Sequence, residues 1–331
     1  MEVSKLLKPC ISVFMVILAL NTSCSKKSIT ASGSGNADTK FKVIGYLPNR
    51  MDLLASARQI DFTKITHLYI AFINPDSLGN LTGTENLKEV AALAHSRNVR
   101  IMASIGGGGA PEYYPSFLIG EKKSKLINDL VNLAVDNDLD GIDVDLEGAL
   151  IDANYESFVT DLAAPLKKQN KLITAAIATV YKDQFTDKAL AQFDFVNIMS
   201  YDRTGPWRPD KPGPHAPYSM AEEDLQYWLE TRKIPKNKLT LGVPFYGYGF
   251  GGTAPESMSY KNILRQYPDS VKEDQMHLNG GMVYYNGLPT IRKKTELAKQ
   301  KVSGVMIWQL LQDSTGAKSL LGEIDRVVKG R

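Results

Sequence analysis

Residues 139–147 read LDGIDVDLE, an alternation of acidic and apolar residues. Along an extended strand, side chains two residues apart face the same side. Asp143, Asp145 and Glu147 therefore share one face, and the apolar residues between them share the other. The apolar face suits packing against helices, whereas three carboxyl groups on an inner face are costly to bury. Because like charges in a confined site do not all ionise, we expect a shared proton and a catalytic role.

Outward from this strand, short apolar segments alternate with helical patterns, which is typical of βα units and a parallel sheet. We predict strands at residues 43–47, 66–72, 100–105, 141–146, 172–178, 195–200, 239–245 and 304–308. Helices are predicted at residues 85–98, 122–136, 155–169, 220–233, 290–301 and 317–329. Eight such units fit a (β/α)8 TIM barrel, for which ~250 residues are typical. A doubly wound open sheet is the alternative that periodicity alone leaves open.

One long insert, residues 251–288, interrupts this alternation after the seventh predicted strand. Residues 280–287 (GGMVYYNG) indicate a small ribbon that ends in an Asn-Gly turn. The insert is too short for a second domain. Residues 41–331 are therefore predicted to form one catalytic domain.

The first residues are not typical of a folded domain. A positively charged start precedes an apolar run at residues 11–20, which is shorter than the ~20 residues of a membrane-spanning helix. We expect residues 1–23 to be a secretory signal peptide. Residues 21–24 (NTSC) resemble a bacterial lipoprotein signal, which implies a lipid on Cys24 and a place at the cell envelope; simple secretion is the alternative. Residues 24–40 are expected to be a flexible linker.

Composition restricts the partners. The net charge of +3 over 331 residues is too small to favour nucleic acid. The two cysteines, Cys10 and Cys24, lie in the signal region, so the mature domain contains no internal disulfide. The four histidines have no metal-ligand spacing. We expect a monomer without a metal or other cofactor, which meets a membrane only through its lipid anchor.

The acidic stretch permits a second interpretation. Residues 136–147 (DNDLDGIDVDLE) satisfy the simple pattern of an EF-hand calcium loop. However, the eighth loop position is Asp143, where such loops usually carry an aliphatic residue, and the alternation favours a strand. A solvated acidic turn is a third possibility, although a turn has no reason to alternate.

Several motifs occur in a fixed order along the chain. Asp140, Asp143, Asp145 and Glu147 fill the pattern Asp-x-x-Asp-x-Asp-x-Glu, which resembles the signature of family 18 glycoside hydrolases, the chitinase family. The other segments that resemble this family are residues 44–46 (IGY), 65–72 (ITHLYIAF), 104–107 (SIGG), 199–202 (MSYD) and 304–308 (GVMIW). The resemblance extends from about residue 43 to the C-terminus and implies a (β/α)8 barrel.

The resemblance implies a role for each acidic residue. Glu147 would protonate the glycosidic oxygen at the carboxyl end of its strand, where barrel enzymes hold their sites. Asp145 would orient the acetamido N–H of the substrate and share a proton with Asp143. The acetamido oxygen itself would act as the nucleophile, through an oxazolinium ion and with retained configuration. Tyr201 would hold that oxygen, and Asp202 would support the hydroxyls of the same sugar.

The resemblance also implies residues that line the substrate site. Trp308 would form the apolar floor beneath the cleaved sugar, with simple barrel packing as the alternative. The other substrate-binding candidates are Met199, Tyr46, Phe72, Gly106, Gly107 and Trp207. For the two glycines, close backbone packing is as good an explanation as sugar approach.

The implied function is cleavage of β-1,4-linked N-acetylglucosamine polymers or oligomers. An endo-β-N-acetylglucosaminidase acting on N-glycans would use the same acid, and a non-catalytic sugar-binding protein is the alternative from another class. Three positions depart from common family residues: Gly108 stands where Trp is frequent, Gly148 where an aromatic residue is frequent, and Tyr248 where Arg is frequent. The insert is too short for the α+β insertion of larger members. We therefore predict a shallow, open cleft that suits soluble oligosaccharides.

Overall fold

The structure is a computed structural model that describes residues 40–50 and 52–331. The predicted signal peptide at 1–23, the lipid site Cys24 and the linker up to residue 39 lie outside the described residues. Within the described part of the chain, no helix is both long enough and apolar enough to cross a membrane.

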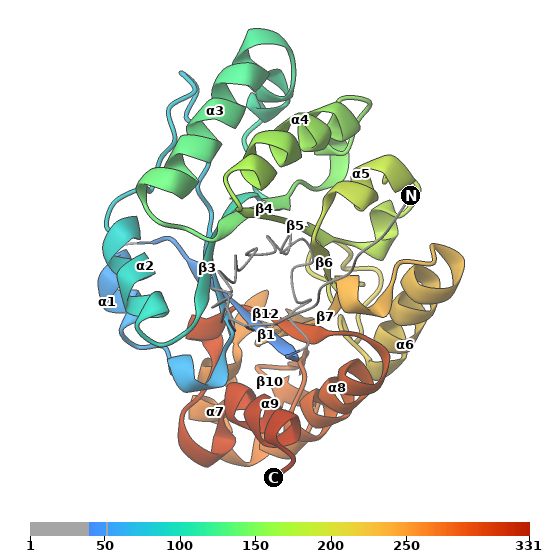
Figure 1. Cartoon of the computed structure of the whole chain (residues 1–331). Helices are drawn as coiled ribbons and strands as arrows, with labels where there is room; N and C mark the ends of the chain where they lie inside the picture. Colours follow the sequence, from blue (N-terminus) through green and yellow to red (C-terminus); the bar gives the residue numbers. More distant parts are fainter. Residues whose placement is uncertain (1–39, 51) are drawn as a thin grey trace, which may run out of the picture. The chain divides into compact units, whose positions relative to one another are not determined.

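Eight parallel strands close into a barrel in the order β1-β12-β7-β6-β5-β4-β3-β2, with helices around them (Figure 1). The strands are β1 (Lys42–Pro48), β2 (His67–Ala71), β3 (Arg100–Gly106), β4 (Gly141–Asp145), β5 (Leu172–Ile177), β6 (Phe195–Ile198), β7 (Leu239–Pro244) and β12 (Gly304–Trp308). Each coincides with a predicted strand. The TIM barrel is therefore confirmed, and the doubly wound open sheet is excluded.

The helices follow the predicted alternation, with shifted ends. They are α1 (Leu53–Ala57), α2 (Leu87–His95), α3 (Gly120–Asp136), α4 (Tyr155–Lys168), α5 (Asp187–Gln192), α6 (Tyr218–Gln226), α7 (Tyr260–Gln266), α8 (Leu288–Lys301) and α9 (Leu320–Lys329). Helices α1, α5 and α7 were not predicted, because segments of 5, 6 and 7 residues are too short to display a helical period.

The two faces of β4 lie in different environments, as the alternation predicted. Ile142, Val144 and Leu146 are buried in the apolar cluster that joins the strands to the surrounding helices. The opposite face looks into the barrel, whose separate apolar cluster includes Tyr46 and Met306. The acidic residues of β4 therefore share the barrel interior with aromatic side chains.

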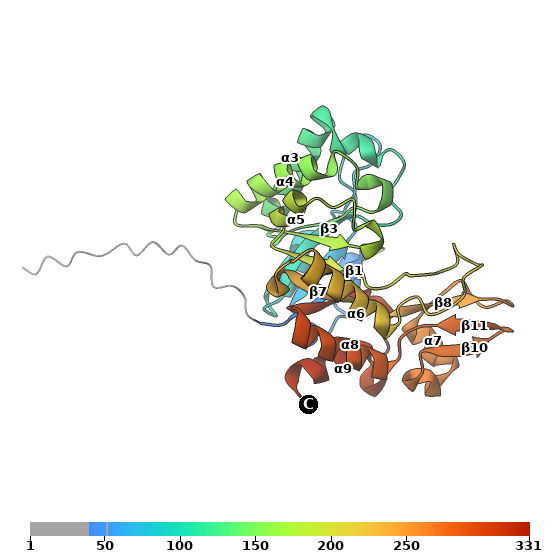
Figure 2. The same ribbon diagram turned by 90° about the vertical axis from the view of Figure 1, so that its right-hand side faces the viewer.

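The insert after β7 is more regular than expected. Strands β8 (Tyr246–Phe250), β9 (Ser257–Ser259), β10 (Gln275–Leu278) and β11 (Gly281–Tyr284) form an antiparallel sheet in the order β10-β11-β8-β9. Figure 2 shows β8, β10, β11 and α7 grouped together beside the barrel.

The predicted Asn-Gly turn was assigned to the wrong pair of residues. The turn of the ribbon is Asn279-Gly280, whose φ angles of 51° and 76° are both left-handed. A two-residue hairpin turn of this kind needs positive φ at both positions. Gly287, with φ of −83°, instead precedes α8 as its N-terminal cap.

Candidate active site

The side chain of Asp143 is fully buried and surrounded by hydroxyl groups. Its register partners on β3 and β5 are Ser104 and Thr174, so all three side chains lie at one level of the barrel. The hydroxyls of Ser104 and Tyr46 donate to Asp143 Oδ2 at 2.7 Å each, and that of Thr174 donates to Oδ1 at 2.6 Å. Burial nevertheless raises the pKa of this carboxyl above its usual range, because these hydrogen bonds only partly offset the loss of water.

Asp145 is buried without such partners. The side chain is 4% exposed, and its Oδ1 has no hydrogen-bond partner in this structure. Burial, followed by the nearby charges of Glu147 and Asp143, raises its pKa well above the usual range. Among the described residues, Asp143 and Asp145 do not hydrogen-bond to each other, because hydroxyls occupy the oxygens of Asp143. The shared proton therefore stays a prediction.

Glu147 lies two residues beyond the end of β4, at the carboxyl end of the barrel strands. Its φ and ψ of −122° and 156° are extended, so the alternation of β4 continues as far as this side chain. Burial, then the charge of Asp202, raises the pKa of Glu147 to about 7. The next residue, Gly148, has a φ of 57°, which strains any other residue type and accounts for the missing aromatic side chain there.

The calcium-loop interpretation of this stretch is wrong. Asp143 and Asp145 belong to a strand and face the barrel interior. Asp140 instead accepts a hydrogen bond from the backbone N–H of Ile101 at 2.7 Å and lies 2.9 Å from His95 Nε2. The acidic side chains thus do not converge on one point, as the ligands of a calcium loop must.

The residues after β6 reach the same region. Tyr201 is buried, and burial followed by the charges of Asp145, Asp202 and Glu147 raises its pKa well above the usual range. Its hydroxyl lies 3.7 Å from Met306 Sδ. The phenol group therefore stays neutral and available as a hydrogen-bond donor among the carboxyl groups.

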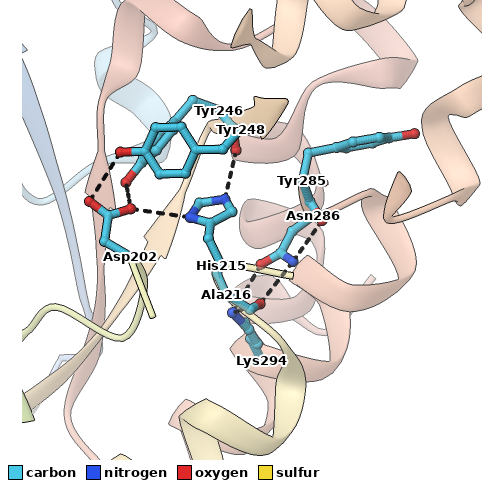
Figure 3. Close-up of polar contacts among 8 residues, drawn as sticks. All are labelled: Asp202, His215, Ala216, Tyr246, Tyr248, Tyr285, Asn286 and Lys294. Carbon is cyan, nitrogen blue, oxygen red and sulfur yellow. Dashed lines mark hydrogen bonds and ion pairs between the residues drawn. The ribbon is translucent and has the colours of Figure 1, made fainter. Parts of the chain in front are cut away.

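Asp202 has a left-handed backbone with φ of 62°, and its side chain is partly exposed. Its Oδ1 accepts from the Tyr246 hydroxyl at 2.5 Å and lies 3.1 Å from His215 Nδ1. Its Oδ2 accepts from the Tyr248 hydroxyl at 3.3 Å. Figure 3 shows these contacts, which tie the end of β6 to strand β8.

Trp308 belongs to an aromatic cluster, and its role as a floor beneath the sugar stays a prediction. Its ring stacks on Phe72 with centroids 5.6 Å apart and meets the edge of Tyr46 at 5.5 Å. Since the Tyr46 hydroxyl also bonds Asp143, this cluster adjoins the acidic face of β4.

The two predicted glycines are required by close packing. A Cβ atom on Gly106 would lie 2.3 Å from the carbonyl oxygen of Asp145, and one on Gly107 would lie 2.4 Å from the Phe72 ring. Both glycines also have positive φ, at 94° and 86°. Close backbone packing is thus sufficient to explain them.

A cavity of about 1250 Å³ lies beside Glu147, between the loops that follow β3, β4, β5 and β6. The predicted site residues that line it are Gly107, Glu147, Met199, Tyr201, Asp202 and Trp207. Asp143, Asp145, Tyr46, Phe72, Gly106 and Trp308 do not line it. Gly108 does, and a Cβ atom there would lie 3.2 Å from Glu147 Oε1, so any side chain at this position would crowd the carboxyl group of the acid.

Several residues around this site were not predicted. Tyr181, Asp224 and Tyr227 also line the cavity, and His215 contacts Asp202 from a loop rich in proline. The sequence carries no local signal for them, because each reaches the site only through the folding of loops and helix ends.

The chain resembles several proteins that have been studied or solved. Residues 42–313 match the model of the family described as Glycosyl hydrolases family 18. The solved structure of a family 18 chitinase from the chitin utilization locus of Flavobacterium johnsoniae is 37% identical, with a TM-score of 0.79, and the alignment covers 88% of this chain and 94% of that one. A chitinase from Bacteroides thetaiotaomicron is 28% identical with a TM-score of 0.76, and 87% and 96% of the two chains are covered.

A curated relative, an uncharacterized glycosylase of Bacillus subtilis, is 26% identical over 227 residues, which cover 58% of this chain. The matched part covers 63% of the relative, so the chain spans less than two thirds of its length. Because the family model matches most of the 331 residues, and the barrel carries the acidic strand in the expected place, the chain belongs to family 18 of the glycosyl hydrolases.

Proposed function

We propose that the protein is a retaining glycoside hydrolase that cleaves β-1,4-linked N-acetylglucosamine polymers or oligomers. The observation that carries this proposal is Glu147, which lies at the carboxyl end of β4 with a pKa raised to about 7. A carboxylic acid that keeps its proton near neutral pH can act as a general acid. It borders a cavity of about 1250 Å³, which offers room for a glycan.

In the first step, Glu147 donates its proton to the glycosidic oxygen while the acetamido oxygen of the substrate attacks the anomeric carbon. The bond to the leaving sugar breaks, and the cleaved sugar becomes an oxazolinium ion. In the second step, water attacks the anomeric carbon, Glu147 takes a proton from that water, and the bond between the anomeric carbon and the acetamido oxygen breaks, which restores the acetamido group. Two displacements retain the configuration of the anomeric carbon.

Two neighbouring residues would serve the acetamido group. The unpartnered Oδ1 of Asp145 is a free acceptor for the acetamido N–H, and the carboxyl group can stabilise the positive charge of the intermediate. The neutral hydroxyl of Tyr201 would donate to the acetamido oxygen and hold it in line for attack. Trp308 would pack beneath the sugar ring. This chemistry requires an N-acetyl group beside the cleaved bond.

The relative from the chitin utilization locus supports chitin-type substrates, because it aligns over nearly the full length of both chains. The test is an assay of N-acetylglucosamine oligomers in parallel with a glycoprotein that carries high-mannose glycans. We expect cleavage of the oligomers. Cleavage of the glycoprotein alone would assign the protein as an endo-β-N-acetylglucosaminidase, and sugar binding without cleavage of either would assign it as a binding protein.

The lipid on Cys24 belongs to the same proposal and is supported by the sequence alone. We expect the protein to incorporate labelled fatty acid when it is expressed in a bacterium that processes lipoproteins, and Cys24→Ala to abolish the label. Equal labelling of the variant would contradict the anchor.

A further inference from the structure

His215 lies in the loop between β6 and α6, and its side chain is 1% exposed. Both ring nitrogens face oxygen atoms (Figure 3). Nδ1 lies 3.1 Å from Asp202 Oδ1, and Nε2 lies 3.3 Å from the backbone carbonyl oxygen of Tyr246. The ring therefore bridges the end of β6 and strand β8.

The nature of these two oxygen atoms limits the protonation state of the ring. A carbonyl oxygen only accepts hydrogen bonds, so the contact of Nε2 is a hydrogen bond only when Nε2 carries a hydrogen. The contact of Nδ1 with the carboxylate oxygen makes the same demand. Both contacts are therefore hydrogen bonds at the same time only when both ring nitrogens carry hydrogen. Because the hydroxyls of Tyr246 and Tyr248 already donate to Asp202, this carboxyl is built to be an acceptor and the proton belongs on Nδ1.

Two aromatic rings and several titratable groups surround the imidazole ring of His215. The aromatic rings of Tyr246 and Tyr248 lie with centroids 5.0 Å and 4.9 Å from that of His215. Titratable or charged groups face it from three elements: Asp202 after β6, the two tyrosines of β8, and Lys294 of α8 across the carbonyl of Ala216. Of these, Asp202 is the group in hydrogen-bond contact with the ring through its side chain.

The backbone that carries His215 is held on both sides. The carbonyl of His215 accepts from the N–H of Arg203 at 2.9 Å. The carbonyl of Ala216 accepts from Lys294 Nζ at 2.8 Å and from Asn286 Nδ2 at 3.0 Å, and Lys294 Nζ also donates to Asn286 Oδ1 at 2.9 Å. Both Lys294 and Asn286 are buried. The backbone on both sides of the ring is thus held by Arg203, by Lys294 of α8 and by Asn286, which lies two residues before that helix.

We propose that His215 is a positioning residue of the active site: a buried imidazolium that fixes the Asp202 carboxylate and balances its charge beside Glu147. Its effect on turnover rests on the proposed function, whereas its protonation does not. The charge of Asp202 helps to raise the pKa of Glu147, so a balanced Asp202 raises it less. His215 thereby sets both the orientation of Asp202 and the pH range in which Glu147 holds its proton.

The first test is nitrogen NMR of the histidine-labelled full chain at neutral pH. Single substitutions at His95 and His277 remove two of the four histidine signals, and Asp202→Asn identifies the signal of His215 by shifting it. We expect both ring nitrogens of His215 to carry hydrogen in the unsubstituted protein, and one to be bare in Asp202→Asn. A bare nitrogen already present in the unsubstituted protein would overturn the proposal, whether or not the protein cleaves any sugar.

The second test is kinetic and uses N-acetylglucosamine oligomers. In His215→Asn, the amide can donate to Asp202 but carries no charge, and His277→Asn is the control because His277 is exposed on β10. We expect kcat/KM to fall roughly ten- to a hundredfold in His215→Asn, as for a displaced active-site group. The alkaline limb of the pH profile of kcat/KM should move to higher pH in His215→Asn. The control His277→Asn should keep both the kcat/KM and the alkaline limb of the unsubstituted protein. An unchanged alkaline limb in a folded His215→Asn would refute the charge role.

Discussion

The carboxyl groups of Asp145 and Asp202 both interact electrostatically with Glu147, and they differ in burial and in hydrogen-bond partners. Asp145 lies inside the barrel, 4% exposed and without a hydrogen bond at its buried oxygen. The side chain of Asp202 lies at the rim, 37% exposed, and it receives two tyrosine hydroxyls and the ring of His215. Burial and like charges raise the pKa of Asp145, whereas three hydrogen-bond partners face the carboxyl group of Asp202.

The difference shows how one site can hold two carboxyl groups in unlike surroundings. Burial, followed by the charges of Glu147 and Asp143, raises the pKa of the inner group. At the rim, the partners come from strand β8 and from the β6–α6 loop, which bring donors to one carboxylate. Burial and the charge of the rim group raise the pKa of Glu147 to about 7.

The largest expected effect concerns Glu147, on which the charge of the rim group acts. Glu147→Gln should lower kcat by roughly 10²- to 10⁴-fold, because the amide cannot donate a proton to the leaving group. The affinity for N-acetylglucosamine oligomers, measured by calorimetry, should stay within a few fold. Glu89→Gln, at an exposed position on α2, is the matched control. Turnover that survives in Glu147→Gln would move the acid to another residue.

The second largest effect is expected for Asp145, the inner carboxyl group. Asp145→Asn should lower kcat by roughly 10²- to 10³-fold, since an amide cannot ionise to balance the positive charge that develops in the intermediate. Asp140→Asn, on the same segment but bonded to Ile101 and His95 outside the barrel interior, should leave kcat unchanged. Equal losses in both variants would show that the effect is structural and that the inner face has no special role.

The charge of Asp202, the rim carboxyl group, should affect the pH dependence of kcat/KM. Because Glu147 must hold its proton to act as an acid, kcat/KM should decline as pH rises above about 7. In Asp202→Asn the charge that helps to raise the pKa of Glu147 is absent, so the decline should begin at lower pH. Initial rates between pH 5 and 9 test this ordering. A limb that moves to higher pH would mean that Asp202 does not act on Glu147 by its charge.

The smallest expected effect concerns Lys294, which holds the loop that carries His215, and the pH dependence of the free energy of unfolding. Burial lowers the pKa of Lys294 from 10.5 to about 7. Between these values the unfolded chain binds more protons than the folded protein, so the free energy of unfolding should rise with pH, by at most about 1.4 kcal/mol per pH unit. Urea unfolding at pH 7.5 and 9 should show this rise, and Lys294→Met should flatten it. Lys293→Met, exposed on α8, should keep the slope; a slope unaffected by Lys294→Met would contradict the assignment.

The two carboxyl groups also differ in how far the sequence could predict them. Asp145 was predictable because β4 alternates strictly, and alternation determines which face a side chain takes. The environment of Asp202 was not, because His215 is 13 residues away in a proline-rich loop, and Lys294, which holds that loop, is 78 residues beyond Ala216. Contacts of this kind depend on how loops fold over the barrel, and no short-range pattern of apolar and polar residues in the sequence predicts them.

The same limit applies to the fold. All eight barrel strands were predicted because each is an apolar segment of several residues, whereas the short helices α1, α5 and α7 were not. Of the two Asn-Gly pairs in the insert, only Asn279-Gly280 forms the hairpin turn. The composition of the two pairs is identical, so the choice depends on the strands that pair on either side.

The central claim is that Glu147 acts together with the acetamido group of the substrate and not with a second protein carboxylate. The most direct measurement compares kcat/KM for the tetramer of N-acetylglucosamine with that for the β-1,4-linked tetramer of glucose, which differs at carbon 2 of each sugar. The account predicts cleavage of the N-acetylated tetramer and none of the glucose tetramer. Comparable cleavage of both would contradict it.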